Sequence, residues 1–566
     1  MLNGRNKTLI GRNRRDSVPS FLVFTLSFAV FYIMIEELLF ANRSLFGSAG
    51  MGNTLVMILI SFLNIAPAGI FAFSVVSVLP NRLCSKYNER RLLTYAPLKS
   101  SPRTAVLYTT FNDFIPECAK FDYEQARRLG LPMFILDDST SMVKKREVDR
   151  FASENDCVIV RRKSRKGYKA GAINNWIGLY GSRFDCMFIL DSDSKAGSDA
   201  IAKCVELARR DPRVGLVQSR TLTMTSNPSM MTNASVTIQH AHMAVVQNAM
   251  KNMGTSPYYG HNALVKIQAL RDVGGLVEES NEDYKTLARM HDVGYESLYA
   301  ESAVTWEETP PDYFSSRKRA LRWARDAVGQ LGLLRFNLPL AMIGYLFYGW
   351  ATYMANAVLV TLFFMLAMRN LSLQISSMGM FAEVAGIVTV SILILWPLLS
   401  LRVSDPVLNV RSLLGAVACT TLFSIPMTAP VALQIIYTTS VKIVAEIKSL
   451  FGRGSRLIEE FVVTPKSIEA KSLGSIFLDL KVELLLGLAP SAVAILTGSV
   501  WFLLFSVVQI LAIFFLPMFI ASESRKVDQS YRVKNHVPIS AKEYAQGYRN
   551  IITPQAMPQT VWIVAN

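Results

Sequence analysis

The sequence predicts an α/β domain, with a doubly wound and mostly parallel sheet, inserted into a bundle of transmembrane helices. Short apolar runs alternate with helix-like segments between residues 100 and 336, which is the pattern of parallel strands joined by helices. Long apolar runs lie on both sides of that region, in a chain with 51% hydrophobic residues and a mean hydropathy of +0.28. About 20 consecutive apolar residues are enough to cross a bilayer.

Five short apolar runs in the inserted region are predicted to be strands, and the segments between them to be helices. The expected strands are 104–109, 133–136, 157–160, 187–190 and 214–218. The expected helices are 118–129, 142–153, 169–180 and 199–209. In sheets of this kind ligands bind at the carboxyl ends of the strands, so a site is expected at that edge.

The apolar runs outside this region are predicted to be membrane helices. The runs 21–40 and 56–79 are expected to form a hairpin with both ends in the cytoplasm, because basic residues flank both ends. Six further crossings are expected after the domain, and the runs 413–444 and 484–520 are each interpreted as a hairpin. The sequence thus indicates a multi-pass protein of the inner (plasma) membrane with a cytosolic domain.

This interpretation divides the chain into seven parts. They are a basic cytosolic N-terminal segment (1–20), a transmembrane hairpin (21–81), a cytosolic domain (100–336), transmembrane helices (337–445), a cytosolic loop (446–483), a transmembrane hairpin (484–520) and a cytosolic tail (521–566). The first apolar run is too long for the apolar part of a signal peptide, so it is expected to remain as an anchor.

Charge and cysteine content limit the classes of partner. The net charge of +16 is expected from cytoplasmic loops, and a basic surface also attracts anionic lipids or a nucleotide. No basic face interleaved with aromatic residues is present, so nucleic acid is not expected as a partner. Four cysteines fall in the cytosolic domain without a C-x-x-C pair, and they are expected to be free thiols.

Acidic pairs follow the second and the fourth predicted strand. Asp137 and Asp138 end the second strand, and Asp191 and Asp193 end the fourth. Two aspartates one residue apart can share a hard divalent cation with substrate phosphates, although short acidic turns are common after strands. A carboxylate after the second strand could accept a hydrogen bond from a base or a ribose, or cap the next helix.

Aromatic and basic residues stand near two other strand ends. Phe111 and Asp113 follow the first strand, where the phenylalanine could stack on a base or be an ordinary loop aromatic. Lys169 lies among small residues at a predicted helix start, which brings backbone N–H groups and a positive charge towards phosphate. The preceding basic residues 161–166 are also consistent with a solvated turn.

Two further helices carry the remaining signals. Glu282 and Asp283 open one helix, where the helix dipole favours acids, and where one of them could act as a general base on an attacking hydroxyl. Arg319, Arg322 and Trp323 lie in a basic amphipathic helix. Such a helix is typical of a membrane surface, but a tryptophan beside an arginine could also stack on a sugar while the arginine binds pyrophosphate.

Taken in order, these motifs resemble those of the inverting membrane glycosyltransferases of family 2, the cellulose-synthase-like group. That group carries D-D, D-x-D, E-D and Q/R-x-x-R-W, which match residues 137–138, 191–193, 282–283 and 319–323. Cellulose synthases have glutamine where this chain has Arg319, so cellulose is not the expected product.

Other segments refine the resemblance. Residues 259–263 and 306–311 look most like bacterial glucosyltransferases that make periplasmic or cyclic glucans. The gating loop of processive members, F-x-V-T-x-K, is matched by Phe461, Val463, Thr464 and Lys466.

The resemblance implies a glycosyltransferase A type domain that moves a sugar, glucose by the nearest-looking relatives, from a UDP-sugar to a growing β-glycan. Membrane helices would then carry the glycan across the bilayer. The implied residues are Phe111, Asp113, Asp137, Asp138, Lys169 and Asp191 for the nucleotide-sugar, Asp191 and Asp193 for Mg²⁺ or Mn²⁺, Glu282 and Asp283 for catalysis, and Arg319, Arg322 and Trp323 for the acceptor and diphosphate.

Two alternatives remain open at the level of sequence. One is non-processive transfer of a single sugar to a lipid carrier, and the other is a membrane transporter with an inactive domain of this kind. The sequence also leaves open the donor sugar, the linkage, the acceptor and any accessory subunit.

Overall fold

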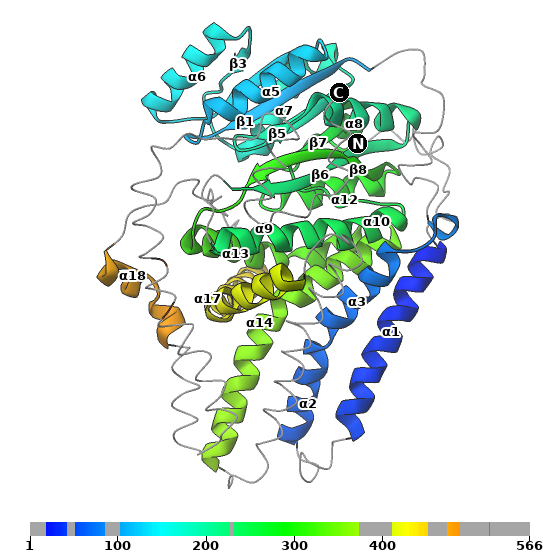
Figure 1. Cartoon of the computed structure of the whole chain (residues 1–566), viewed down its shortest axis with the longest axis vertical. Helices are drawn as coiled ribbons and strands as arrows, with labels where there is room; N and C mark the ends of the chain where they lie inside the picture. Colours follow the sequence, from blue (N-terminus) through cyan, green and yellow to red (C-terminus); the bar gives the residue numbers. More distant parts are fainter. Residues whose placement is uncertain are drawn as a thin grey trace.

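The computed structural model describes residues 18–41, 51–84, 102–225, 230–372, 410–450 and 472–485, together with residues 515 and 520. A sheet domain lies at one end of the molecule, and long helices run away from it (Figure 1). These are α1 (Val18–Ala41), α2 (Met51–Leu63), α3 (Ile65–Ser77) and α14 (Leu340–Ser372). Helices α9 (Met230–His242), α13 (Tyr313–Ala327) and α17 (Val410–Leu450) lie between the sheet and the long helices (Figure 1).

An eight-stranded sheet forms the centre of the domain, in the order β3-β2-β1-β4-β7-β6-β8-β5. The strands are β1 (Thr104–Thr110), β2 (Met133–Asp137), β3 (Val158–Val160), β4 (Cys186–Asp191), β5 (Lys195–Ala196), β6 (Val214–Met224), β7 (Ala263–Lys266) and β8 (Glu296–Glu308). The first four in spatial order pair in parallel, as predicted. Strand β7 is antiparallel to both β4 and β6, and β5 is antiparallel to β8, whereas β6 and β8 pair in parallel. The sheet is therefore mixed, with four of its seven neighbouring strand pairs parallel.

Helices cover both faces of this sheet and create two cores. The neighbouring residues Phe188 and Ile189 of β4 are both fully buried, but they belong to different cores, as the alternation of side chains along a strand requires. The first core is covered by α5 (Pro116–Arg128), α6 (Met142–Glu154) and α8 (Ser198–Arg210). The second is covered by α7 (Tyr168–Tyr180), α10 (Asn248–Asn252), α11 (Ile267–Asp272) and α12 (Glu282–Asp292).

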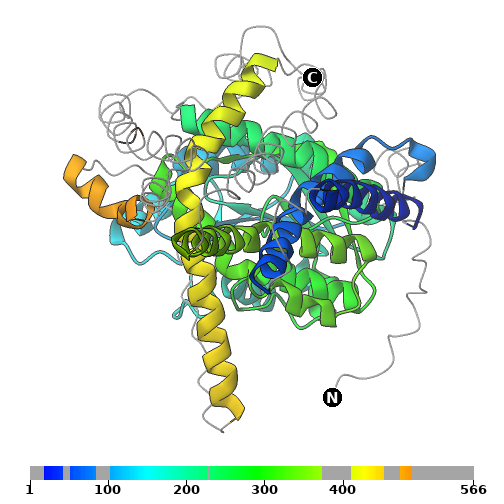
Figure 2. The same ribbon diagram turned by 90° about the horizontal axis from the view of Figure 1, so that it is seen from below.

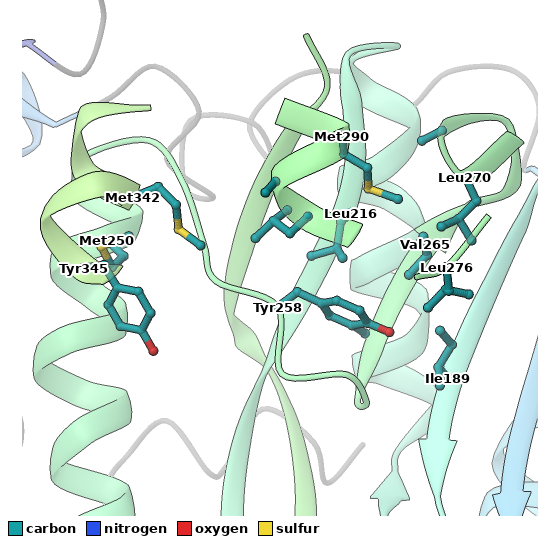
Figure 3. Close-up of a cluster of buried hydrophobic side chains, with 14 of the residues drawn as sticks. Ile189, Leu216, Met250, Tyr258, Val265, Leu270, Leu276, Met290, Met342 and Tyr345 are labelled. Atoms are coloured by element: carbon teal, nitrogen blue, oxygen red, sulfur yellow. The ribbon is translucent and has the colours of Figure 1, made fainter. Parts of the chain in front are cut away.

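The second core continues into the long helices. Phe73 of α3 and Leu346 of α14 are buried in the same cluster as Ile189 of the sheet. Figure 3 shows members of this cluster, from Ile189 on the sheet to Tyr345 on α14. Burying a large apolar side chain contributes about 1.5–3 kcal/mol. The sheet domain and the long helices are therefore held together by a shared apolar core.

Three described helices are long and apolar enough to cross a membrane, over Val18–Glu37, Ile58–Ser77 and Pro426–Lys448. The first two overlap the predicted runs. Glu36 in the first accepts hydrogen bonds from Ser61 Oγ (2.6 Å) and Asn64 Nδ2 (3.0 Å) of the second. Polar groups inside a membrane are costly unless they are paired, so this contact accounts for an acid within an apolar run.

The predicted hairpin at 413–444 is wrong, because α17 is one continuous helix of 41 residues. Pro426 and Pro430 lie inside this helix. Membrane helices tolerate proline, and no glycine or asparagine accompanies the two prolines between residues 421 and 431, so nothing favours a turn there. Figure 2 shows α17 running across α14. Most of the predicted hairpin 484–520 lies outside the described residues.

Within the described part of the chain, the cysteines of the sheet domain, Cys118, Cys157, Cys186 and Cys204, form no disulfide bond, as expected.

Candidate active site

Asp191 is the centre of the acidic edge of the sheet. It ends β4 and pairs in register with Thr109 of the parallel strand β1. Its Oδ1 atom accepts hydrogen bonds from Thr109 Oγ1 (3.1 Å) and Lys169 Nζ (3.0 Å). The carboxyl ends of parallel strands meet at one edge, and the structure brings the predicted Asp191 and Lys169 into direct contact there.

Lys169 lies in the first turn of α7, after Gly167 in the left-handed conformation (φ 71°). Burial opposes the charge of its ammonium, but Asp191, Glu282 and Asp283 outweigh burial and raise the pKa of Lys169. Lys169 is therefore charged at neutral pH, and the acids of α12 act on it together with Asp191.

Gly260 lies between the side chains of Lys169 on α7 and Asp283 on α12. Its φ is +82°, and a Cβ atom there would lie 3.4 Å from Lys169 Nζ and 3.8 Å from Asp283 Oδ2. The side chains of Lys169 and Asp283 thus lie on the same side of one glycine, although they are more than a hundred residues apart in the chain. The predicted phosphate-binding lysine and the predicted base share one site.

Asp283 is a buried carboxyl group with a raised pKa. It lies in the first turn of α12, and its Oδ1 atom accepts a hydrogen bond from the Tyr284 backbone N–H (2.8 Å). Burial, followed by the neighbouring charge of Glu282, raises the pKa of Asp283 to about 7. A carboxyl that titrates near neutral pH is well matched to accepting a proton from a hydroxyl.

Asp113 holds the turn that contains Asp193. Its Oδ2 atom accepts a hydrogen bond from Ser192 Oγ (2.7 Å), and its Oδ1 atom accepts from Thr110 Oγ1 (3.0 Å) and the Phe111 N–H (2.8 Å). Asp193 itself is only 5% exposed. The predicted nucleotide-binding Asp113 therefore supports the turn between the two aspartates of the D-x-D motif.

The acidic pair after β2 is bound by two consecutive arginines. Asp137 Oδ2 accepts from Arg161 Nε (2.7 Å), and Asp138 accepts from Arg162 Nε (2.8 Å) and Nη2 (2.6 Å). Arg162 also donates to the carbonyl oxygen of Tyr168 (2.5 Å) at the start of α7. These basic residues thus connect the acidic pair to the helix that carries Lys169, and Arg162 is not a solvated turn residue.

Phe111 does not present both faces of its ring to solvent. The guanidinium carbon of Arg165 lies 3.3 Å from the centre of the ring. Burial lowers the pKa of Arg165, although Asp138 and Asp113 oppose that effect. A base that stacks on Phe111 must use the other face of the ring or displace Arg165.

The predicted acceptor residues lie on α13. The guanidinium carbon of Arg319 is 4.9 Å from the ring centre of Trp323, and the Trp323 side chain remains 42% exposed. Burial lowers the pKa of Arg319, and the charges that act on it include Glu307, Arg322 and Asp193. The charge of Asp193 thus reaches Arg319 of the R-x-x-R-W segment, and the tryptophan of that segment is accessible.

His261 and Glu307 belong to the site, but reasoning from the residues did not assign them a role. His261 Nε2 lies 2.5 Å from Glu307 Oε2, and its Nδ1 lies 3.7 Å from Asp191 Oδ2. Burial opposes protonation of the ring, but Asp191 and Glu307 prevail and raise the pKa of His261 to about 9. In the sequence, these residues stood out only because they lie in the segments 259–263 and 306–311, which resemble the glucosyltransferases. No sequence spacing indicates that the start of β7 and the end of β8 meet.

The donor set at Asp191 and Asp193 fits a hard divalent cation that is completed by phosphate oxygens. Within the described ranges, no group of three or more His, Cys, Asp or Glu side chains could hold a metal by itself. Mg²⁺ is commonly bound by one or two carboxylates together with substrate phosphates. Asp191 and Asp193 would provide those two carboxylates, and substrate would supply the remaining ligands.

The predicted gating residues belong to the segment 461–466. Phe461, Val463, Thr464 and Lys466 lie outside the described residues.

Comparison with known proteins gives concordant matches. Residues 187–404 match the family described as Glycosyl transferase family group 2. The chain is 24% identical over 333 residues to glucans biosynthesis glucosyltransferase H of Bradyrhizobium diazoefficiens, covering 52% of this chain and 44% of the relative. It is 26% identical over 267 residues to glucomannan 4-beta-mannosyltransferase 1 of Cyamopsis tetragonoloba, covering 44% and 50%. The match thus spans about half the length of these relatives.

Among solved structures, a mannosyltransferase from Pyrobaculum calidifontis in complex with GDP-Man and Mn²⁺ matches with a TM-score of 0.44 and 19% identity, over 65% of this chain and 99% of that chain. The family match begins in β4 and contains both aspartates of the D-x-D motif, the acids of α12 and the R-x-x-R-W segment. Through this domain, the chain is similar to the family 2 glycosyltransferases.

Proposed function

We propose that the protein transfers a sugar from a UDP-sugar, with inversion, to a growing β-glycan, and that Asp283 is the general base. The supporting observation is the joint position of three groups. Lys169 contacts Asp191 at 3.0 Å, and both Lys169 and Asp283 lie against Gly260. A cation for the diphosphate and a carboxylate for the acceptor hydroxyl are thereby held in one site.

In the proposed reaction Asp283 removes the proton from an acceptor hydroxyl. The hydroxyl oxygen forms a bond to the anomeric carbon, while the bond from that carbon to the phosphate oxygen breaks and UDP leaves. One displacement inverts the anomeric centre, so an α-linked donor gives a β-glycoside. A positioned base contributes roughly 10²–10⁴-fold to the rate of such a step.

Other residues bind the donor and stabilise the departing charge. Lys169 faces the diphosphate as a fixed positive charge. Asp191 and Asp193 would hold Mg²⁺ or Mn²⁺, which supplies Lewis-acid stabilisation of the leaving diphosphate when bound. Phe111, with Asp113 and the Asp137–Asp138 pair nearby, lines the proposed base and ribose region.

The acceptor is proposed to approach from the side of the membrane helices. Trp323 offers an exposed ring on α13, and Arg319 and Arg322 flank it. The core of the sheet domain continues into α3 and α14, so a product made here would emerge beside helices able to carry it. We include cytosolic catalysis, translocation of the glycan and closure by the 461–466 loop in the proposal.

The relatives' names include both glucosyl and mannosyl transfer, and UDP-glucose is the proposed donor. The test is release of nucleoside diphosphate by purified full-length protein in lipid nanodiscs with Mg²⁺, screened over UDP-glucose, other UDP-sugars and GDP-mannose. We expect UDP release from UDP-glucose and a β-linked polymer by linkage analysis. No release from any donor would refute the enzyme, and a single-sugar lipid product would refute polymer synthesis.

A further inference from the structure

Three tyrosines, Tyr259, Tyr284 and Tyr345, form a hydroxyl cluster at the junction of the sheet domain and α14. The hydroxyls of Tyr284 and Tyr345 are 3.0 Å apart, and their rings stack with centres 6.2 Å apart. Tyr345 also forms a side-chain hydrogen bond with Tyr259. Tyr259 lies in the segment before β7, Tyr284 lies on α12 and Tyr345 lies on α14.

The Tyr259 hydroxyl is held by further polar groups. Gln247 Nε2 donates a hydrogen bond to it, and His242 Nε2 lies 3.2 Å away. Burial lowers the pKa of His242 to about 4, so its ring is neutral at pH 7. Gln247 ends a short π-helical segment, Met243–Gln247, and such segments often occur at functional sites.

Two tyrosines of the cluster are chain neighbours of residues in the candidate active site, and the third, Tyr345, lies on α14. Tyr284 directly follows Asp283, and Tyr259 directly precedes Gly260. The neighbouring Tyr258 is buried in the core that also contains Tyr345 (Figure 3), and its hydroxyl donates to the Gly260 carbonyl (3.0 Å). The cluster therefore joins the two backbone segments that meet around Lys169.

We propose that Tyr345 is a positioning residue, which fixes the backbone segments of Asp283 and Gly260 relative to each other from α14. This inference rests on the proposed function, because it assigns Tyr345 to holding the general base against the Lys169–Asp191 pair. Tyr345 acts through its hydrogen bonds with Tyr284 and Tyr259, which are the chain neighbours of Asp283 and Gly260. A small displacement of a catalytic group is enough to cost a large part of the rate.

The argument depends on hydroxyl groups rather than on the packing of rings. Tyr345 is 8% exposed and packs in the second core next to Met342 and Met250 (Figure 3). Phenylalanine would keep that packing and remove one hydroxyl from two hydrogen bonds. Tyr284 and Tyr259 would then lose the partner that they share.

The test compares the full-length protein with Tyr345→Phe, Tyr284→Phe and the double variant in nanodiscs, measuring UDP release against donor concentration. We expect each single variant to lower kcat about 3- to 10-fold, as for one lost hydrogen bond, with KM for the donor changed less than about twofold. The double variant should lose no more than Tyr345→Phe alone, because that change already breaks the contact that Tyr284→Phe removes.

Tyr348→Phe is the matched control, one turn further along α14. Its ring packs edge-on against Phe73 (5.2 Å between centres) and lies outside the cluster. We expect this variant to keep its kcat within about twofold. Unchanged kcat in Tyr345→Phe, multiplicative losses in the double variant, or an equal loss in Tyr348→Phe would each overturn the positioning role. Absence of turnover in the unaltered protein would instead refute the proposed function.

Discussion

Asp283 is a carboxyl group whose surroundings oppose its own charge. Burial and the adjacent Glu282 raise the pKa of Asp283 to about 7, and the positive charge of Lys169 offsets them only in part. Such a group is costly to ionise in the folded protein, and this cost is what makes the carboxylate basic enough to accept a proton near pH 7. The first two predictions concern single residues in this setting.

We expect kcat to fall about tenfold for each unit of pH below 7, because only ionised Asp283 can accept the proton.

The free energy of unfolding should show the opposite trend and decrease as the pH rises. The pKa of Asp283 is higher in the folded than in the unfolded chain, so the cost of ionising it appears between about pH 4 and 7 and is complete above pH 7. Asp283→Asn should therefore be more stable than the unaltered protein at pH 8, and equally stable near pH 4. Thermal unfolding in detergent at both pH values tests this, and equal stability at pH 8 would contradict it.

A second prediction concerns the arginine that binds both oxygens of Asp138. The side chains of Arg162 and Asp138 are only 12% and 9% exposed, so Arg162→Lys, which cannot form the two-point contact, should lower the free energy of unfolding by about 1–3 kcal/mol. The matched control is Arg103→Lys, whose pair with Asp185 is 63% and 48% exposed. That control should leave stability unchanged, because solvent screens an exposed ion pair. Equal effects in denaturant unfolding would show that the Arg162 pair has no special role.

At the scale of elements, the strands that were predicted from sequence are the ones with continuous apolar runs. Strands β1 to β4 and the start of β6 were expected, because buried parallel strands are apolar on both faces. Strands β7 and β8 were not. Strand β7 has only four residues, and β8 mixes exposed and buried positions over thirteen residues with glutamates at both ends. Sequence therefore located the D-x-D aspartates correctly but did not show that β7 and β8 bring His261 and Glu307 to them.

The glycine between α7 and α12 gives a prediction at this scale. Gly260→Ala places a methyl group in contact with Lys169 Nζ (3.4 Å) and Asp283 Oδ2 (3.8 Å), at a backbone φ of +82°, and should lower turnover because the methyl group fills the space that the ammonium and the carboxylate share. Gly130→Ala carries a similar φ of +66° with no atom within 4 Å of the new methyl group. It therefore shares the cost of backbone strain, about 1 kcal/mol, without the steric effect. Comparable turnover of the two variants would contradict the role assigned to Gly260.

At the scale of the whole molecule, the sheet domain and the long helices form a single packed body. The sequence indicated both parts, since apolar runs and alternating strands are local patterns. It did not indicate that α3 and α14 enter the core of the domain, because that contact joins Phe73, Ile189 and Leu346 from distant parts of the chain. It also misjudged α17, where prolines suggested a hairpin and the chain forms one helix.

The proposal for the whole molecule also includes the segment that resembles a gating loop. Thr464→Ala and Lys466→Ala should each lower kcat, because a loop that closes over UDP loses its contacts, while UDP binding to the acidic site should weaken less. Turnover and UDP affinity, measured on the same preparations, check this. Unchanged kinetics in both variants would remove the gating role.

The most direct measurement of the central claim is sugar transfer and UDP binding by Asp283→Asn in the full-length protein. Asparagine keeps the size of the side chain and removes the basic oxygen, so we predict that UDP release is lost, by roughly 10²-fold or more, while UDP still binds. Transfer at the unaltered rate, with UDP bound as before, would contradict the assignment of Asp283 as the base and with it the mechanism proposed for this site.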